Sequence, residues 1–180
     1  MHKLKLCSYN IKWMAHLFKK KGVEPLTGSS EEAERSKAIA YVIKAVDPDI
    51  LGICEAPNSP QHLENWVREF LSDAGYNVVM SEEGFLSRGQ QELAVLYKSE
   101  KVHVGVAHER NAKRDPFTED YVNVLIDHVL FSQGIKISEP GCGRVWNPYQ
   151  NEKEIGDKKL REALDNASDH YPVSVEVEIE

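Results

Sequence analysis

A continuous apolar run in the first third of the chain constrains the fold more than any other feature. Residues 50–54 read Ile-Leu-Gly-Ile-Cys, between the turn sequence Asp47-Pro48-Asp49 and an acidic residue, Glu55. A short run without a polar face is typical of a strand that is buried on both faces of a sheet. The turn sequence ends a preceding helical pattern, and Ser59-Pro60 begins another. This order of elements predicts an α/β protein.

The remaining elements are predicted from the spacing of apolar residues. Apolar stripes and helix-end signals predict helices at residues 31–46, 60–74 and 157–167. Apolar or alternating runs predict strands at residues 3–10, 50–54, 76–80, 93–97, 102–107, 122–132 and 173–179. We expect a single domain over residues 1–180, in which mixed sheets carry helices on the outside.

Composition limits the possible functions. The net charge of −7 argues against a protein that coats nucleic acid non-specifically. The run Lys19-Lys20-Lys21 is either a solvated surface or a local positive field beside a site for an anion. Cys7, Cys54 and Cys142 lack the spacing of metal ligands, and the first two fit reduced, buried packing residues. With no secretion signal and no membrane-length apolar run, we expect a soluble, cytoplasmic protein.

Polar residues stand at several strand positions where an apolar or turn residue would serve the fold equally well. Asn10 and Glu55 end two predicted strands, Asp127 lies inside a third, and Asp169-His170 precedes the last. Ligands of open α/β sheets gather at the carboxyl ends of strands. Asn10, Glu55 and Asp169 would together provide oxygen ligands suited to Mg²⁺ or Mn²⁺. Asp127 is placed to orient the imidazole of His170.

Each candidate also has a plainer interpretation. Asn10 and Glu55 fit residues that cap turns after strands, and an Asp-His pair is common in loops. Arg88 precedes a predicted strand and would reach a phosphate by a bidentate contact, but it also fits an ordinary surface arginine.

Four motifs resemble, in order, those of the endonuclease/exonuclease/phosphatase (DNase I-like) superfamily. They are Ser8-Tyr9-Asn10-Ile11, the stretch from Asp47 to Glu55, Ile126-Asp127-His128-Val129-Leu130, and Ser168-Asp169-His170-Tyr171-Pro172-Val173. Leu93 to Lys98 is similar to the family's strand after the second helix. The resemblance covers about residues 3–107 and 122–179. It implies a sandwich of two mixed β-sheets flanked by helices.

The resemblance also implies an activity, the Mg²⁺-dependent hydrolysis of a phosphoester, most simply a phosphodiester. Glu55 would be the main metal ligand, and Asn10 would orient the scissile phosphate or a metal-bound water. Asp169 would assist the metal site. His170, paired with Asp127, would contact the phosphate or transfer a proton.

The chain departs from the family pattern in its middle. Family members carry further strands and an Asp-x-Asn motif where this chain has only residues 108–121, and no Asp-x-Asn occurs anywhere in it. The domain is therefore predicted to be internally shortened, with uncovered sheet edges through which it would oligomerise. Three hypotheses stay open: an active phosphoesterase, an impaired remnant that binds metal, phosphate or another protein, and a fragment completed by another chain. The net charge favours a small or lipid-linked phosphoester over long duplex DNA, and the lysine run near Asn10 keeps nucleic acid possible.

Overall fold

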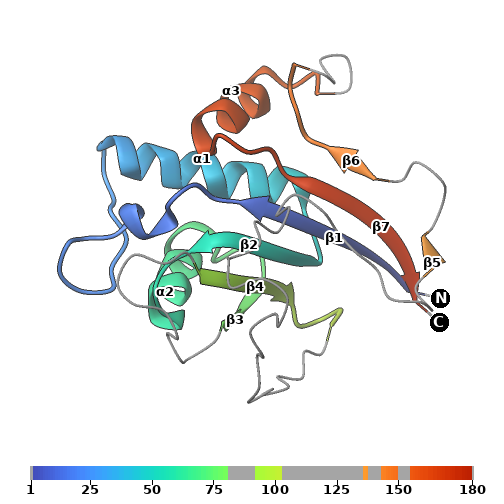
Figure 1. Ribbon diagram of the computed structural model, residues 1–180, viewed down its shortest axis with the longest axis horizontal. Helices are drawn as coiled ribbons and strands as arrows, with labels where there is room; N and C mark the ends of the chain where they lie inside the picture. Colours follow the sequence, from blue (N-terminus) through green and yellow to red (C-terminus); the bar gives the residue numbers. More distant parts are fainter. Residues whose placement is uncertain (1, 81–91, 103–135, 138–142, 150–154, 180) are drawn as a thin grey trace, which may run out of the picture.

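The computed structural model describes residues 2–80, 92–102, 136–137, 143–149 and 155–179. The seven strands found in these residues form one mixed sheet, in the order β3-β4-β2-β1-β7-β5, with β6 also pairing with β7 (Figure 1). The strands are β1 (His2–Asn10), β2 (Ile50–Ala56), β3 (Tyr76–Met80), β4 (Glu92–Lys98), β5 (Lys136–Ile137), β6 (Arg144–Val145) and β7 (Val173–Ile179).

The apolar run at residues 50–54 forms most of the interior strand β2. This strand lies between β1, to which it is parallel, and β4, to which it is antiparallel. Leu51 and Ile53 are almost completely buried. The predicted α/β fold of mixed strands and flanking helices is confirmed, and the described strands form one sheet where a sandwich of two was expected.

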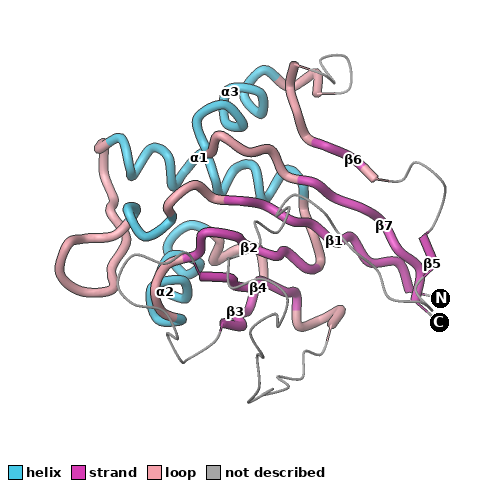
Figure 2. Tube along the Cα trace, in the orientation of Figure 1, coloured by secondary structure: helices cyan, strands magenta, loops and turns pink. Residues whose placement is uncertain are grey.

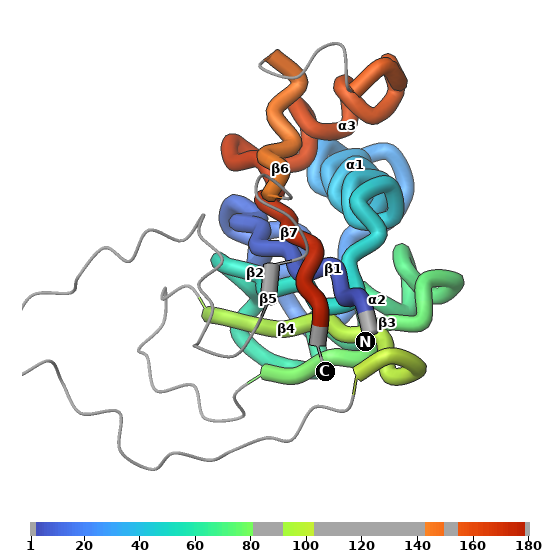
Figure 3. Tube along the Cα trace, turned by 90° about the vertical axis from the view of Figure 1, so that its right-hand side faces the viewer, coloured from blue at the N-terminus to red at the C-terminus, as the bar shows by residue number. Residues whose placement is uncertain are grey.

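The helices share one core with the sheet. They are α1 (Glu31–Val46), α2 (Pro60–Phe70), α3 (Lys158–Ala167) and the short 3₁₀ helix η1 (Met14–Leu17). Their buried residues join one face of the sheet: Cys7, Tyr9, Leu51, Ile53, Ala94 and Leu96. Helices α1 and α3 lie on the same side of the sheet, as the two views in Figures 2 and 3 show.

A second, smaller apolar cluster lies on the other face of the sheet. Leu4 of β1 pairs with Val177 of β7, and both are buried together with Val175. Because side chains alternate along a strand, this cluster faces away from Cys7 and Tyr9. Most of the two strands predicted after residue 101, at 102–107 and 122–132, lies outside the described residues.

Local signals explain the helix ends. The Ser30 side chain accepts a hydrogen bond from the Ala33 amide and so caps α1, while Asp47 ends it in a left-handed conformation. Helix α2 ends at Phe70, earlier than predicted, and Gly75 (φ 70°) occupies the turn before β3. The strands β5 and β6 were not predicted, because two residues are too few to show the alternation of polar and apolar side chains that marks a strand.

Two smaller expectations concern the cysteines and the membrane. Cys7 and Cys54 are buried free thiols, as predicted, and burial raises the pKa of Cys7 to about 12. Among the described residues, no helix is both long enough and apolar enough to cross a bilayer.

Candidate functional site

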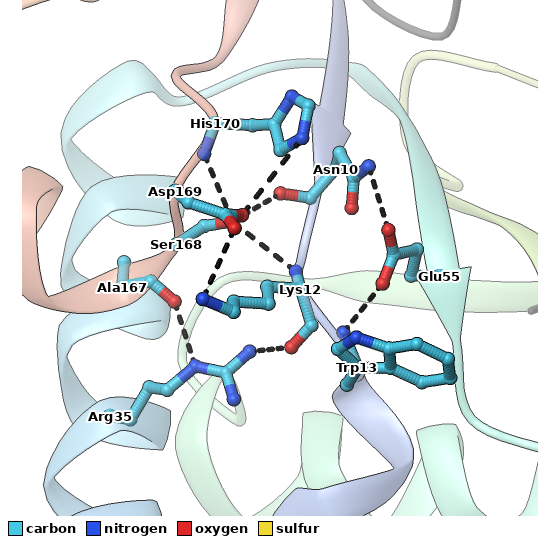
Figure 4. Close-up of polar contacts among 9 residues, drawn as sticks. All are labelled: Asn10, Lys12, Trp13, Arg35, Glu55, Ala167, Ser168, Asp169 and His170. Atoms are coloured by element: carbon cyan, nitrogen blue, oxygen red, sulfur yellow. Dashed lines mark hydrogen bonds and ion pairs between the residues drawn. The ribbon is translucent and has the colours of Figure 1, made fainter.

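Strand directions bring three separate parts of the chain to one edge of the sheet. The parallel strands β1 and β2 end together, with Asn10 paired to Cys54. Strand β7 is antiparallel to β1 and pairs Val173 with Ser8, so the residues just before it lie at the same edge. The strand ends that carry Asn10, Glu55 and the Asp169-His170 segment therefore converge, as Figure 4 shows.

Glu55 occupies an irregular position in β2. The pairing with β4 shifts register between Cys54 and Ala56, so Glu55 is the extra residue of a bulge. Its φ of 60° lies in the left-handed region, which costs a residue with a side chain about 1–2 kcal/mol. The bulge turns the half-buried carboxylate toward β1. Its Oε1 accepts a hydrogen bond from Asn10 Nδ2 (3.1 Å), and its Oε2 accepts one from the Trp13 amide (2.8 Å).

Asn10 is buried, with 2% of its surface exposed. Because the Glu55 carboxylate only accepts hydrogen bonds, the Nδ2 of Asn10 must face it, which fixes the orientation of the amide. In the part of the chain that the structure describes, the opposite atom, Oδ1, is buried without a hydrogen-bond partner. Such an acceptor is costly to bury, and it is suited to a ligand that brings a proton or a cation.

Ser168 connects the last loop to the end of β1. Its buried hydroxyl donates to the Asn10 carbonyl oxygen (2.8 Å) and accepts from the amides of Lys12 (3.2 Å) and His170 (3.3 Å). One side chain thereby provides hydrogen-bond partners for three backbone groups at the sheet edge, beyond the paired part of β1 and β7. The position of the Asp169-His170 segment depends on this hydroxyl.

Asp169 is exposed and lies between two basic groups. Its Oδ2 is 3.1 Å from the Lys12 ammonium, and its Oδ1 is 3.9 Å from His170 Nε2. Partial burial raises the pKa of Asp169, but the hydrogen bond and the charge of Lys12 outweigh it, so the pKa lies below the usual value. The carboxylate is therefore ionised and neutralised chiefly by Lys12.

Arg35 joins helix α1 to the same edge. Its Nε donates to the Ala167 carbonyl oxygen (3.0 Å), and its Nη2 donates to the Lys12 carbonyl oxygen. Burial lowers the pKa of Arg35, and the nearby Tyr9, Asp169 and Glu55 act in the opposite direction. The guanidinium therefore contributes positive charge behind both carboxylates.

Trp13 is the exposed aromatic residue beside Glu55. It has a left-handed backbone (φ 47°) and begins η1, and 43% of its surface is exposed. Its ring stacks on His16 at 5.7 Å between centroids, with 10° between the planes. A large exposed aromatic side chain next to a carboxylate at a sheet edge is available to a ligand.

The predicted site residues divide into those that the structure describes and those that it does not. Asn10, Glu55, Asp169 and His170 lie at one edge, linked by the contacts given above. Asp127 and Arg88 lie outside the described residues, so their predicted roles stay predictions.

A metal site can be assessed from the donor atoms present. Within the described ranges, no group of three or more His, Cys, Asp or Glu side chains is arranged to hold a metal ion. The amide oxygen of Asn10 and the carboxylate of Glu55 nevertheless form a pair of oxygen donors, and both are ligands that Mg²⁺ accepts. The chemistry of these donors fits a magnesium ion with several waters in its coordination shell.

Lys12, Trp13, Arg35 and Ser168 were not assigned a role from the sequence. Two of them had a usable signal. Lys12 follows a strand end by two residues, and Arg35 precedes the core residue Ile39 by one helical turn, which places it on the buried face of α1. The left-handed turn at Trp13 had no signal, because glycine or asparagine normally marks that conformation.

Comparisons with known proteins add little to this description. No family model and no curated protein matches the chain. Solved structures of TDP2 from Caenorhabditis elegans align with it at a TM-score of 0.33 and 22% identity, over 54% of this chain and 23% of that protein. A truncated TDP2 from the same organism aligns at a TM-score of 0.33 and 24% identity, over 54% of this chain and 30% of that chain. The chain thus spans less than a third of these proteins.

Proposed function

We propose that the chain is a Mg²⁺-dependent phosphoesterase that hydrolyses phosphodiester bonds. The observation that carries the proposal is the buried Oδ1 of Asn10, for which the described residues provide no partner, next to Glu55 at the carboxyl edge of two parallel strands. The ordered sequence motifs that resemble the endonuclease/exonuclease/phosphatase superfamily support the same activity. Both lines of support concern the same residues.

The side chains at this edge have distinct tasks in the proposed reaction. Glu55 and Asn10 would hold the magnesium ion, which when bound polarises a phosphoryl oxygen and offsets negative charge. Lys12 and the guanidinium of Arg35 provide positive charge for the remaining phosphate oxygens. His170 is half-buried, its Nε2 lies 3.9 Å from Asp169 Oδ1, and its imidazole would donate or accept a proton.

The test is the hydrolysis of bis(4-nitrophenyl) phosphate, followed by release of 4-nitrophenolate. We expect turnover with Mg²⁺ and none with EDTA. Glu55→Gln and His170→Gln should each lower the rate by roughly 100-fold or more, the effect of losing one group that stabilises transition-state charge. Glu55→Gln preserves side-chain length, removes the charge and replaces one of the two accepting oxygens by an amide nitrogen.

Glu64→Gln is the matched control, because this exposed glutamate of α2 lies outside the site. It should retain the rate of the unmodified chain. Turnover that persists in EDTA and in both site variants would contradict the proposal.

A second function is favoured by the pairing of Asp169. The Lys12 ammonium, 3.1 Å away, already neutralises this carboxylate, which leaves Glu55 as the nearest charged ligand for a metal. That arrangement suits a domain that binds Mg²⁺ or phosphate without turning over a substrate. Calorimetric binding of Mg²⁺ that Glu55→Gln abolishes, in a chain that shows no hydrolysis, would establish this alternative.

A further inference from the structure

A pocket of about 590 Å³ lies beside the candidate site, between the loop around η1 and the start of α2. Four of its lining residues carry basic side chains: His16, Lys19, Lys20 and His62. One lining residue, Glu32, is acidic. The pocket has the size of a ligand site, and its basic side chains suit an anion.

The positive charge of this region is unusual for the chain. Residues 11–23 contain four lysines and one histidine but no acidic residue, whereas the whole chain has a net charge of −7. If these lysines served only solubility, they would not need to lie around a pocket or on a loop that is held in place. Here the basic side chains are concentrated around one cavity, which focuses their field on whatever enters it.

The loop that carries the lysines is held in place by backbone contacts. The Lys19 amide donates to the Glu24 carbonyl oxygen (3.0 Å), and Gly22 (φ 98°) makes the turn between them. The buried Asn65 of α2 donates to the Val23 carbonyl oxygen (3.1 Å). The loop is therefore tied to α2, and little of its backbone needs to be ordered when a ligand binds.

Two of the residues that line the pocket lie close to Glu55 in the chain or through a shared contact. Asn58, which lines it, follows Glu55 by three residues, a span of at most about 11 Å. His16 also lines the pocket and stacks on Trp13, whose amide donates to the Glu55 carboxylate. A substrate with its scissile group at Glu55 can therefore extend over Trp13 into the pocket.

We infer that this pocket binds a second phosphate group of the substrate, so that the preferred substrate is a phosphodiester that also carries a phosphate monoester. This inference rests on the proposed function, because it assumes that the scissile phosphodiester binds at Glu55. A nucleotide with a terminal phosphate and a phosphorylated glycerophosphoinositol share this chemistry. Lys19 and Lys20 would contact the monoester, and Glu32 opposes it.

The test is calorimetric binding in EDTA, where the proposed hydrolysis cannot occur. One pair of probes is the thymidine dinucleotide TpT and its 5′-phosphorylated form; the other is glycerophosphoinositol and its 4-phosphate. We expect the extra phosphate to tighten binding about tenfold in at least one pair, the factor typical of a hydrogen bond to a charged group. The pair with the larger gain identifies the source of the phosphate.

Variants locate the effect. Lys19→Gln/Lys20→Gln should abolish the gain, and Glu32→Gln should increase it. Lys3→Gln/Lys158→Gln removes the same charge from exposed positions outside the pocket and should leave the gain unchanged. The inference would be overturned if both members of both pairs bound with equal affinity. It would also be overturned if the control variant lost as much of the gain as Lys19→Gln/Lys20→Gln. Hydrolysis of bis(4-nitrophenyl) phosphate with unchanged Glu55 dependence would then leave the proposed function intact.

Discussion

Replacement of Ser168 by alanine tests whether one hydroxyl holds the candidate site together. The hydroxyl serves the buried Asn10 carbonyl and the amides of Lys12 and His170. Lys12 is exposed, so water can replace the hydrogen bond of its amide, and His170 is half-buried. The Asn10 carbonyl has no such access. The main cost is therefore one buried acceptor without a partner.

The loss of that partner should lower the free energy of unfolding by about 2 kcal/mol, within the range of 1–3 kcal/mol for such a group. For a chain of 150–250 residues, this corresponds to a fall in Tm of roughly 4–8 °C. Urea unfolding measures the first quantity and calorimetry the second. Hydrogen exchange should also become faster at the amides of Lys12 and His170, because both lose their acceptor.

Ser36→Ala is the matched control. Ser36 lies in α1 and is completely buried, and no partner for its hydroxyl is found in the described part of the chain. Alanine removes an unsatisfied group and has the higher helix propensity, so this variant should be neutral or more stable. A Ser168→Ala protein within about 0.5 kcal/mol of the unmodified chain, the range of ordinary surface substitutions, would refute the reasoning.

Three further predictions concern the backbone and the charges. Glu55→Gly should be more stable than Glu55→Ala by about 1 kcal/mol in urea unfolding, because only glycine adopts φ 60° without strain. Burial raises the pKa of Asp49, but hydrogen bonds from Lys101 and from the Lys5 amide outweigh it and lower the pKa. The ionised Asp49 therefore stabilises the fold at pH values above its unfolded pKa. This stabilisation is lost as the pH falls through the lower pKa of the folded state. Asp49→Asn should remove that pH dependence and cost about 1–3 kcal/mol at neutral pH. Lys12→Gln should raise the pKa of Asp169, measured by carboxyl NMR, because the main lowering group is lost.

The edge that carries the site was predictable from the sequence. An apolar run such as residues 50–54 identifies an interior strand, and the helix between it and β1 makes the two strands parallel. Parallel strands end at the same edge, so Asn10 and Glu55 had to be neighbours once the strands were found. This part of the site follows from the spacing of apolar residues and the lengths of the connections between elements.

The contacts within the site were not predictable in the same way. Ser168 and Asn10 are separated by 158 residues, and no local pattern reports that their atoms meet. The left-handed conformations of Trp13 and Glu55 occur without glycine, so their sequence signals are missing. The ammonium of Lys12, two residues beyond the end of β1, lies 3.1 Å from Asp169, which is 157 positions further along the chain. Tertiary structure determines these features.

Two energetic costs coincide at the edge of the sheet. Glu55 adopts a strained conformation, and the neighbouring Asn10 buries an oxygen for which the described residues provide no partner. A sheet selected only for stability would carry glycine at the first position and an apolar residue at the second. The hydrogen bond between Asn10 and Glu55 offsets neither cost. It involves Nδ2 of Asn10 and not the buried Oδ1, and it leaves the backbone of Glu55 unchanged. Both costs fall on the neighbouring ends of two parallel strands, one carrying a carboxylate and the other a buried amide oxygen. Strain and unsatisfied polarity of this kind collect at functional sites, and here they fall on the two residues proposed to hold the magnesium ion.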